Sequence, residues 1–421
     1  NNCYNKNMNT NTKQLFKNVA AFPENENWEK NISRLGKFSA NNEFEIRSEF
    51  ERDYNRIINC CAYSRLKHKT QVFFATDNDH VCTRIEHVNY VASISKSIAK
   101  YLGLNTELVE AISLGHDLGH SPFGHHGERI IIKIMEEEGF RYKFWHEYNS
   151  LRFVDEVETL PNQEGWSENL NLTYAVRDGI VSHCGEVDEN ALIPRKEFID
   201  LKEIKKGQYM PFTYEGCVVK ISDKIAYLGR DLQDAALYNF FDKNDYLTLR
   251  QIAENIVKEK VKLKEINTTY LMHKFILDLC ENSTPETGLN FSQENYELMR
   301  QIKKFNFEKI CMNRRLKPFM EYANLVLRTL YNFLKDYYAD FNTISNLAKD
   351  APYYREIIKS FCSWLIKYSN IDTKQRVNKK YKNKIIYNME NEMDYKQAII
   401  DYISSMTDKF AIKVYEELIT F

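Results

Sequence analysis

The chain contains few residues that interrupt helices, with 8 prolines and 14 glycines among 421 residues. No Pro-, Gly- or Ser-rich linker divides it, although its length alone would permit two or three domains. No stretch approaches the run of about 18 apolar residues that crosses a membrane, and no segment reads as a signal peptide. The pattern GxxxxGK[ST] is absent, which argues against a P-loop NTPase. We therefore expect one large helical unit with a C-terminal helical extension and no membrane partner.

The net charge argues against a protein that mainly binds nucleic acid, and the cysteine usage argues against a framework of disulfides. The 58 lysines and arginines are balanced by 59 acidic residues, which argues against nucleic-acid binding as the main role. The basic run 374–384 is expected to be a solvated loop, although it could contact single-stranded DNA or a nucleotide at a subunit contact. The nine cysteines are odd in number and lack CxxC spacing, which favours reduced thiols and a cytoplasmic location.

The segment 114–128, LGHDLGHSPFGHHGE, is the most informative part of the chain. It holds four histidines, one aspartate, one glutamate, four glycines and one proline in fifteen residues. A lone His-Asp pair on a helix is usually a surface pair or a satisfied core histidine. Clusters this dense around a Gly/Pro-broken turn seldom arise from packing, so the segment indicates a site.

Three apolar patterns place acidic residues and histidines on helices. Apolar residues recur at helical spacing over 106–118, so His116 and Asp117 are predicted near the end of a helix. His87 opens a second amphipathic segment, and Asp223 lies within a third. Adjacent helical residues point about 100° apart, so His116 and Asp117 can both reach one ion only if it lies beside their helix. Other helices must then complete its coordination, and we predict that the three helices converge on one ion.

Two imidazoles and two carboxylates form a mixed nitrogen and oxygen site, which suits Mn, Fe, Zn, Ni or Mg. Four protein ligands on an octahedral ion would leave two positions for water and a substrate oxygen. Open positions indicate a catalytic rather than a structural metal.

Beyond this set, the chain resembles the HD-domain superfamily of metal phosphohydrolases and, more closely, the dGTP triphosphohydrolase family. The matching motifs cover the chain from about residue 45 to its end, at 52–57, 64–73, 116–128, 145–152, 171–180, 223–231 and 401–408. The resemblance implies an all-α fold with an HD-domain helical bundle core. It implies a partly disordered N-terminal arm at 1–44, the core at 45–270 and a C-terminal helical region at 271–421. The first 20 residues in particular are expected to be disordered.

The resemblance also assigns roles by matching position. The implied metal ligands are His87, His116, Asp117 and Asp223. The implied catalytic pair is His125 with Glu128, and His120 and His146 would contact the phosphates or the leaving oxygen. The implied triphosphate contacts are Arg84, Lys224 and Tyr227, and the implied deoxyribose contacts are Gln71, Val72 and Asp231. Because His126 follows His125 directly, the sequence leaves open which imidazole faces the phosphate.

The implied activity is metal-dependent hydrolysis of deoxynucleoside triphosphates, with dGTP preferred, to deoxynucleoside and inorganic triphosphate. The implied cofactor is a divalent ion, Mn or Mg first, with Fe, Zn, Ni and Co as alternatives. A homo-oligomer is expected, with room for a nucleotide or single-stranded DNA effector. Two alternatives stay open: an HD hydrolase of nucleoside monophosphates or cyclic nucleotides, and a nucleotide- or DNA-sensing oligomer without turnover.

Overall fold

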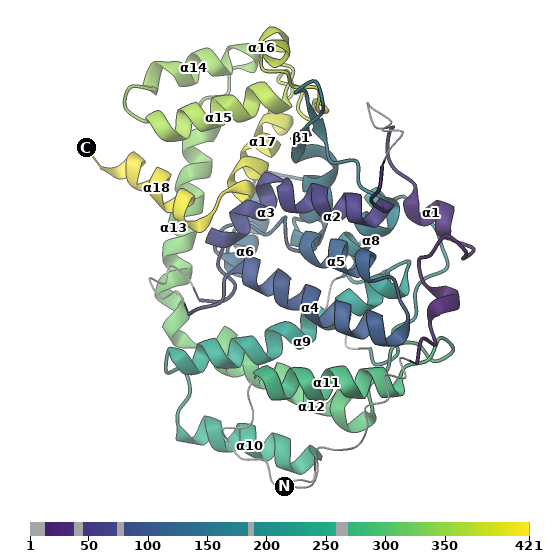
Figure 1. Cartoon of the computed structure of the whole chain (residues 1–421). Helices are drawn as coiled ribbons and strands as arrows, with labels where there is room; N and C mark the ends of the chain where they lie inside the picture. The colour runs from purple at the N-terminus through teal and green to yellow at the C-terminus, as the bar shows by residue number, and fades with distance from the viewer. Residues whose placement is uncertain (1–12, 38–44, 74–79, 184–188, 258–267, 421) are drawn as a thin grey trace.

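The computed structural model describes residues 13–37, 45–73, 80–183, 189–257 and 268–420 (Figure 1). The all-α prediction is confirmed. Within these ranges the only sheet is an antiparallel pair, β1 (Thr159–Pro161) and β2 (Ser167–Asn169), with Thr159 opposite Asn169. No helix in the described ranges is long and apolar enough to cross a membrane.

The central bundle carries the predicted site. Helix α4 packs on α5 and α9, and α5 packs on α2 and α8, so that α2, α5 and α4 form successive layers at the centre of Figure 1. The helices of this bundle are α2 (Glu49–Asn59), α3 (Cys61–Arg65), α4 (Arg84–Leu102), α5 (Thr106–Gly115), α6 (Gly124–Glu137), α7 (His146–Arg152), α8 (Tyr174–Ser182) and α9 (Tyr214–Leu237). Short turns η2 (Leu66–His68), η3 (Phe153–Val157) and η4 (Leu201–Glu203) join them.

Local signals in the sequence set the boundaries of α4 and α5. The backbone N–H of Thr83 donates to Glu86 (2.7 Å), which closes a capping box at the start of α4. Helix α4 ends at Gly103, whose φ of 85° is a left-handed conformation that favours glycine. The Asn105 side chain then accepts from the backbone N–H of Glu107 (3.0 Å) and starts α5.

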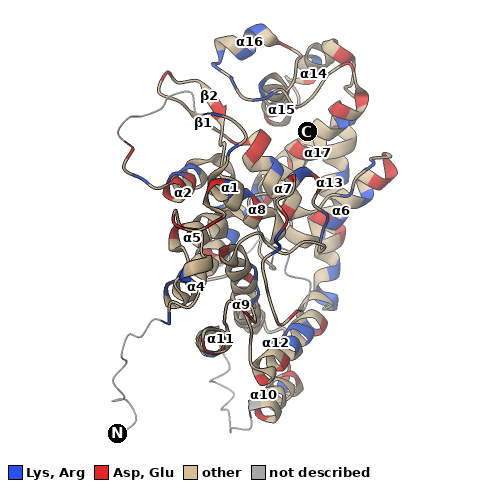
Figure 2. Cartoon of the chain, turned by 90° about the vertical axis from the view of Figure 1, so that its right-hand side faces the viewer, with Lys and Arg blue, Asp and Glu red and all other residues tan. Residues whose placement is uncertain are grey.

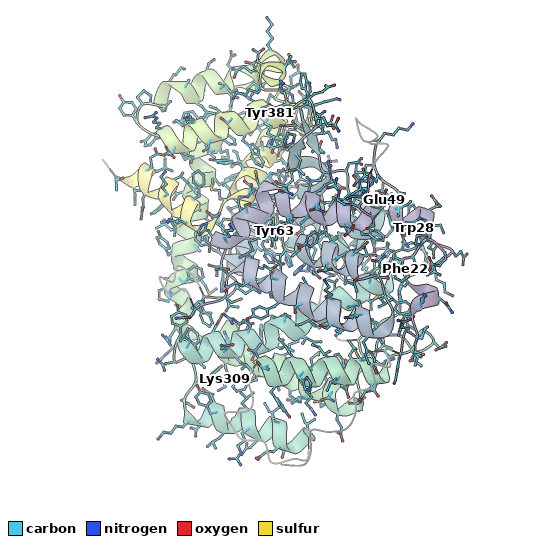
Figure 3. All side chains as sticks on the ribbon, in the orientation of Figure 1. Phe22, Trp28, Glu49, Tyr63, Lys309 and Tyr381 are labelled. Carbon is cyan, nitrogen blue, oxygen red and sulfur yellow. The ribbon has the colours of Figure 1, made fainter. Side chains whose placement is uncertain are left out.

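A second layer packs below the central bundle. It consists of α10 (Lys243–Val257), α11 (Thr268–Asn282), α12 (Gln293–Asn306) and the turns η6 (Phe307–Cys311) and η7 (Arg314–Leu316). Lys309, labelled in Figure 3, ties η6 to α10 through an ion pair with Asp245 (2.7 Å). Helix α11 packs on α9 and α4 and spans the predicted boundary between residues 270 and 271. The domain division therefore stays a prediction.

The C-terminal region is built on the long helix α13 (Lys317–Lys335), which packs on α6, α17 and α18. The other elements of the region are η8 (Asp340–Asn342), α14 (Thr343–Asp350), α15 (Arg355–Tyr368), α16 (Thr373–Asn378), α17 (Glu392–Ser405) and α18 (Asp408–Ile419). The chain breaks at Met406 and Thr407, between α17 and α18. Thr407 caps α18 by accepting from the backbone N–H of Phe410 (3.1 Å).

The N-terminal arm is partly packed. Residues 1–12 lie outside the described part, but the expected disorder does not hold for 13–20, because Phe16 is fully buried edge-on against Tyr214. This segment contains η1 (Lys17–Val19), and α1 (Trp28–Ile32) follows. Trp28, labelled in Figure 3, packs edge-on against Phe50 of α2. The backbone N–H groups of Phe16 and Ala21 also donate to Leu102 and Glu215, so the segment is held on the core by burial and hydrogen bonds together.

Two predictions about the surface and thiols can be compared with the structure. The basic run 374–384 begins as α16 and not as a loop, and its lysines are exposed as expected. The seven cysteines of the described ranges are all free thiols, in agreement with a reduced protein. The other two, Cys3 and Cys184, lie outside the described residues.

Candidate metal centre and active site

The glycines of the segment 114–128 permit close packing between α5, α6 and α7. A Cβ atom on Gly119 would lie 2.1 Å from the backbone nitrogen of Ser150, and one on Gly127 would lie 1.9 Å from the carbonyl oxygen of Pro122. Only glycine allows these approaches. The turn therefore brings histidines from both sides of the Pro/Gly break next to α7.

The C-terminal region fixes this turn from a distance. The Asp408 carboxylate accepts from the backbone N–H groups of Thr70 (3.1 Å) and Phe123 (2.9 Å). The buried Lys69 ammonium donates to the carbonyl oxygens of Ser404 (3.0 Å) and His120. The break before α18 therefore places Asp408 where two loops of the site meet.

The four predicted metal ligands come together from α4, α9 and the end of α5. His87 Nε2 lies 2.9 Å from Asp223 Oδ1 and 4.0 Å from Asp117 Oδ2. His116 Nε2 lies 3.6 Å from Asp117 Oδ1 and 3.9 Å from Asp223 Oδ1. We call His87, His116, Asp117 and Asp223 the metal cluster.

The chemistry of the metal cluster fits a divalent cation. His116 Nδ1 donates to the carbonyl oxygen of Ser113 (2.7 Å), so Nε2 carries the lone pair. This Nε2 is buried and has no hydrogen-bond partner in the described structure. A buried lone pair facing two carboxylates is what a metal would satisfy.

Both carboxylates of the metal cluster are held in the ionised form that metal binding requires. Burial would raise the pKa of Asp117, but the charges of His120 and Arg84 outweigh it and hold this pKa well below its usual range. Burial would also raise the pKa of Asp223, yet the hydrogen bond from His87 lowers it to about 2. Burial would lower the pKa of His87, but the Asp223 carboxylate raises it, so this ring must release a proton when a metal binds.

The sequence reasoning missed a fifth candidate ligand, His183. Its ring is buried and lies 4.8 Å from the ring of His116, and its ligand atom groups with those of His116 and Asp117 within 4.8 Å. Its Nδ1 donates to the carbonyl oxygen of Ile180 (2.6 Å). Burial lowers the pKa of His183 to about 4, so the ring is neutral. A histidine directly after the apolar helix α8 was the signal available in the sequence.

A second group adjoins the metal cluster. It comprises His120, His125, Glu128 and His146, which we call the histidine–glutamate cluster. Glu128 Oε2 lies 3.0 Å from His146 Nδ1 and 3.4 Å from His125 Nδ1. His120 Nε2 lies 3.1 Å from Asp117 Oδ1, so one contact joins the two clusters.

The histidine–glutamate cluster is organised differently from a ligand set. The rings of His120 and His146 stack at 3.9 Å with an angle of 19° between their planes. The lone pairs of imidazole lie in the ring plane, so two nearly parallel rings direct them side by side, although the ligand atoms of this cluster also lie within 4.8 Å of one another. Burial would lower the pKa of His146, but the carboxylates of Glu147 and Glu128 raise it to about 9. This cluster therefore holds a proton.

The structure separates His125 from His126. The His125 ring lies 5.2 Å from that of His120 and 5.5 Å from that of His146, and its side chain is 60% exposed. His126 turns away, pairs with Arg129 and packs edge-on against Phe319. His125 is thus the imidazole that shares an opening with the buried cluster.

Two of the predicted substrate contacts lie beside the clusters with unused polar atoms. Arg84 NH1 donates to Asp117 Oδ2 (2.6 Å), while its Nε and NH2 are buried without a hydrogen bond to any described residue. Gln71 is half-buried, and its Oε1 also has no partner in the part of the chain that is described. Val72 is half-buried against the apolar cluster around Phe73.

The remaining predicted contacts follow Asp223 along α9. Lys224 and Tyr227 line a small cavity that Arg300 and Lys303 of α12 also line. Asp231 lies two turns beyond Asp223. Burial, reinforced by the charge of Asp234, raises the pKa of Asp231 to about 7. Near neutral pH a large fraction of Asp231 is thus an uncharged carboxyl group.

Comparisons with known proteins identify the class of the protein. The HD domain family matches residues 84–228, which contain every residue of both clusters, and the phosphohydrolase-associated domain family matches residues 346–417. Helical architecture, a His/Asp metal cluster and these matches define the class as HD-domain phosphohydrolases.

Individual relatives narrow the class. A deoxyguanosinetriphosphate triphosphohydrolase-like protein of Caldanaerobacter subterraneus is 32% identical over 89% of this chain and 86% of its own length. Proteins of the same name in Clostridium tetani and Rickettsia bellii are each 30% identical, and the alignments cover 89% and 92% of their respective lengths. The chain belongs to the family of deoxyguanosinetriphosphate triphosphohydrolase-like proteins, and the resemblance inferred from its motifs is confirmed.

Proposed function

We propose that this protein hydrolyses deoxynucleoside triphosphates, with dGTP preferred, to deoxynucleoside and inorganic triphosphate. The observation that carries the proposal is the contact between His120 and Asp117 (3.1 Å), which places the histidine–glutamate cluster directly beside the metal cluster. A group that binds phosphate charge and a group that moves protons are the two requirements of phosphoester hydrolysis. The names of the relatives support the choice of substrate.

His87, His116, Asp117 and Asp223 would hold a divalent ion, Mn or Mg, with Fe, Zn, Ni and Co as alternatives. When bound, this ion supplies a Lewis acid that neutralises charge on a phosphate oxygen. His183 would complete or orient the ligand shell from α8. The protein's own part is to keep both carboxylates ionised and to fix the orientation of the His116 ring through its Nδ1.

The histidine–glutamate cluster would manage the protons. Glu128 holds His125 through Nδ1 (3.4 Å), which leaves the Nε2 of this exposed ring to take a proton from the attacking water. His146, with its pKa raised to about 9, would carry positive charge opposite the phosphates and can donate to the leaving 5′-oxygen. The Glu128 carboxylate would thus contact both the imidazole that accepts a proton, His125, and the imidazole that donates one, His146.

Side chains around the clusters would fix the nucleotide. The buried Nε and NH2 of Arg84 can donate to a phosphate oxygen, and Lys224 and Tyr227 would bind the rest of the triphosphate. Gln71 Oε1 can accept from a sugar hydroxyl, and an uncharged Asp231 can donate to a sugar oxygen. Val72 would pack against the sugar.

Product analysis tests the proposal. The purified protein is incubated with each dNTP and NTP in Mn or Mg, and the products are separated by ion-exchange chromatography. We expect deoxyguanosine and inorganic triphosphate, with ribonucleotides poorly used. Orthophosphate or diphosphate as the first product, or hydrolysis only of monophosphates or cyclic nucleotides, would contradict it. Repeating the assay with His126→Ala, a neighbour that turns away from the site, controls for substitution beside the cluster.

We also propose a homo-oligomer that responds to a nucleotide or single-stranded DNA effector. Light scattering during size-exclusion chromatography measures the number of chains in the oligomer. An elution mass of one chain at all concentrations would contradict it.

A further inference from the structure

The junction between α17 and α18 lies far along the chain from both clusters but packs against the loops of the site. Asp408 is the first residue of α18, and its side chain is buried. Figure 2 shows α17 gathered with α6, α7 and α13 on one side of the molecule. Helix α13 packs on both α6 and α18. The C-terminal region therefore supplies a buried carboxyl group beside the helix that carries His125 and Glu128.

The Asp408 carboxylate joins two loops that are distant in the sequence. Its Oδ2 accepts from the backbone N–H of Thr70 (3.1 Å) and from the hydroxyl of the same residue. Its Oδ1 accepts from the backbone N–H of Phe123 (2.9 Å). Because each oxygen holds a different loop, the carboxylate fixes the backbone at Thr70 relative to the backbone at Phe123.

Each of these loops leads directly into predicted functional residues. Thr70 precedes Gln71 and Val72, the predicted sugar contacts. Phe123 precedes α6, whose first turn carries His125, the imidazole that would accept a proton. A shift of one loop against the other would change the position of the sugar relative to this imidazole.

The two loops touch at the start of α6. A Cβ atom on Gly124 would lie 3.5 Å from the carbonyl oxygen of Gln71 and 3.6 Å from that of Thr70. The residue before it, Phe123, has a φ of 64°, a left-handed conformation that is unfavourable for a phenylalanine. The Phe123 ring is buried and packs edge-on against Phe319. Asp408 and the packing of this ring therefore stabilise a strained turn.

We propose that Asp408 is a positioning residue, which fixes the sugar-contact loop at Thr70 against the turn at Phe123 and thereby sets both the turnover rate and the preference for deoxyribose. Its effect on rate and sugar preference rests on the proposed function. Thr70 and Phe123 belong to neither cluster, so loss of the carboxylate should leave the metal content unchanged. Displacement of a reacting group by about 1 Å can lower a rate about 100-fold.

Two variants weaken the joint between the loops to different degrees. Asp408→Asn keeps the size of the side chain but turns an NH2 group toward one of the two loops. Thr70→Val removes only the hydroxyl donor. The matched control is Asp53→Asn, because the buried Asp53 carboxylate also accepts from a backbone N–H, that of Thr173 (2.7 Å), and pairs with Arg34 (2.6 Å).

Hydrogen–deuterium exchange of the full chain in EDTA measures how firmly the loops are held. For Asp408→Asn we expect faster exchange in peptides that contain Thr70 and Phe123. Thr70→Val should show a smaller change in the same peptides. In Asp53→Asn the faster exchange should be confined to peptides around its own partners, such as Thr173.

Kinetics with dGTP and GTP in Mn²⁺ measure the consequence for the reaction. Asp408→Asn should lower kcat about 10- to 100-fold and lower the ratio of kcat/KM for dGTP over GTP about tenfold, at unchanged metal content. Thr70→Val should change both quantities in the same direction by less. Asp53→Asn should lower the melting temperature and leave both quantities at the parent values.

The inference is overturned if Asp408→Asn matches Asp53→Asn in kcat and in sugar preference, or if exchange around Thr70 and Phe123 is unchanged. If Asp408→Asn does not fold, Thr70→Val decides by the same criteria. A parent protein that hydrolyses no dNTP would contradict the proposed function instead. In that case the exchange measurement alone decides whether Asp408 holds the two loops together.

Discussion

The metal cluster and the histidine–glutamate cluster contain the same kinds of side chain but are organised in opposite ways. In the first, His116 has its Nδ1 fixed by a backbone carbonyl and its Nε2 buried without a hydrogen bond within the described structure. In the second, Glu128 accepts from two imidazoles, and His120 stacks on His146. The first group presents a buried nitrogen to two carboxylates, whereas in the second the raised pKa of His146 keeps a proton on that ring.

The comparison shows that the atoms around a histidine ring determine its tautomer and its basicity. A fixed tautomer that presents a lone pair to two carboxylates selects a cation. A carboxylate placed against Nδ1 of an imidazole raises its basicity and keeps a proton there. Histidines four residues apart in the sequence, His116 and His120, thus differ in their contacts: His116 Nδ1 donates to a backbone carbonyl, whereas His120 Nε2 lies beside the Asp117 carboxylate.

The largest expected effect comes from removing a carboxylate of the metal cluster. Asp117→Ala should abolish metal binding and reduce kcat by roughly 10³-fold or more, because it removes a ligand and leaves Arg84 without its partner. Plasma mass spectrometry of the dialysed protein measures the metal content. Full occupancy in this variant would show that the two clusters have been assigned the wrong way round.

Variants of the histidine–glutamate cluster should separate turnover from metal binding. His125→Ala or Glu128→Gln is expected to reduce kcat by about 10²- to 10⁴-fold, the range for loss of general acid–base catalysis, while metal content stays unchanged. His126→Ala serves as the control, since this ring packs against Phe319. If either catalytic variant retained full activity, the assignment of the pair would be incorrect.

A smaller effect is expected for the ligand candidate that sequence reasoning missed. His183→Gln should weaken metal affinity about 10- to 100-fold, as loss of a supporting or additional ligand does. Competition with a fluorescent chelator measures this affinity. An unchanged metal affinity together with a lower melting temperature would show that His183 contributes to packing and not to metal binding.

The smallest effect concerns stability. Burial raises the pKa of Asp231 from 3.8 to about 7, so the folded state retains a proton that the unfolded state loses between these values. Stability therefore falls as the pH rises through that window. Asp231→Asn removes this loss and, in EDTA, should be more stable than the parent at pH 8 by about 2 kcal/mol, allowing for partial exposure. Urea unfolding at pH 4 and pH 8 measures the free energy of unfolding of both proteins. The prediction is contradicted if the difference between variant and parent does not grow with pH.

Much of the fold and site could be predicted because the signals are local. Helical spacing around His116 and the capping residues before α4 and α5 are encoded within a few positions. The four ligands form a recognisable pattern, although their convergence needs the tertiary structure. What the sequence could not indicate depends on distant contacts. Phe16 is held by Tyr214, and the break before Asp408 is stabilised by Thr70 and Phe123.

The roles of the substrate contacts depend even more on tertiary structure. Sequence places Asp231 two turns from Asp223, but only burial in the folded chain makes it uncharged near neutral pH. The position of His125 beside His120, and of His126 against Phe319, likewise depends on the tertiary structure. Neighbouring positions on a helix look equivalent in sequence until the packing partner, here Phe319, is known.

The most direct measurement is the anomalous scattering of Mn²⁺ in crystals of the full chain. The account predicts one peak at full occupancy, bounded by His87, His116, Asp117 and Asp223. A principal peak between His120, His125, His146 and Glu128, or no peak in crystals whose protein turns over substrate with Mn²⁺, would contradict it.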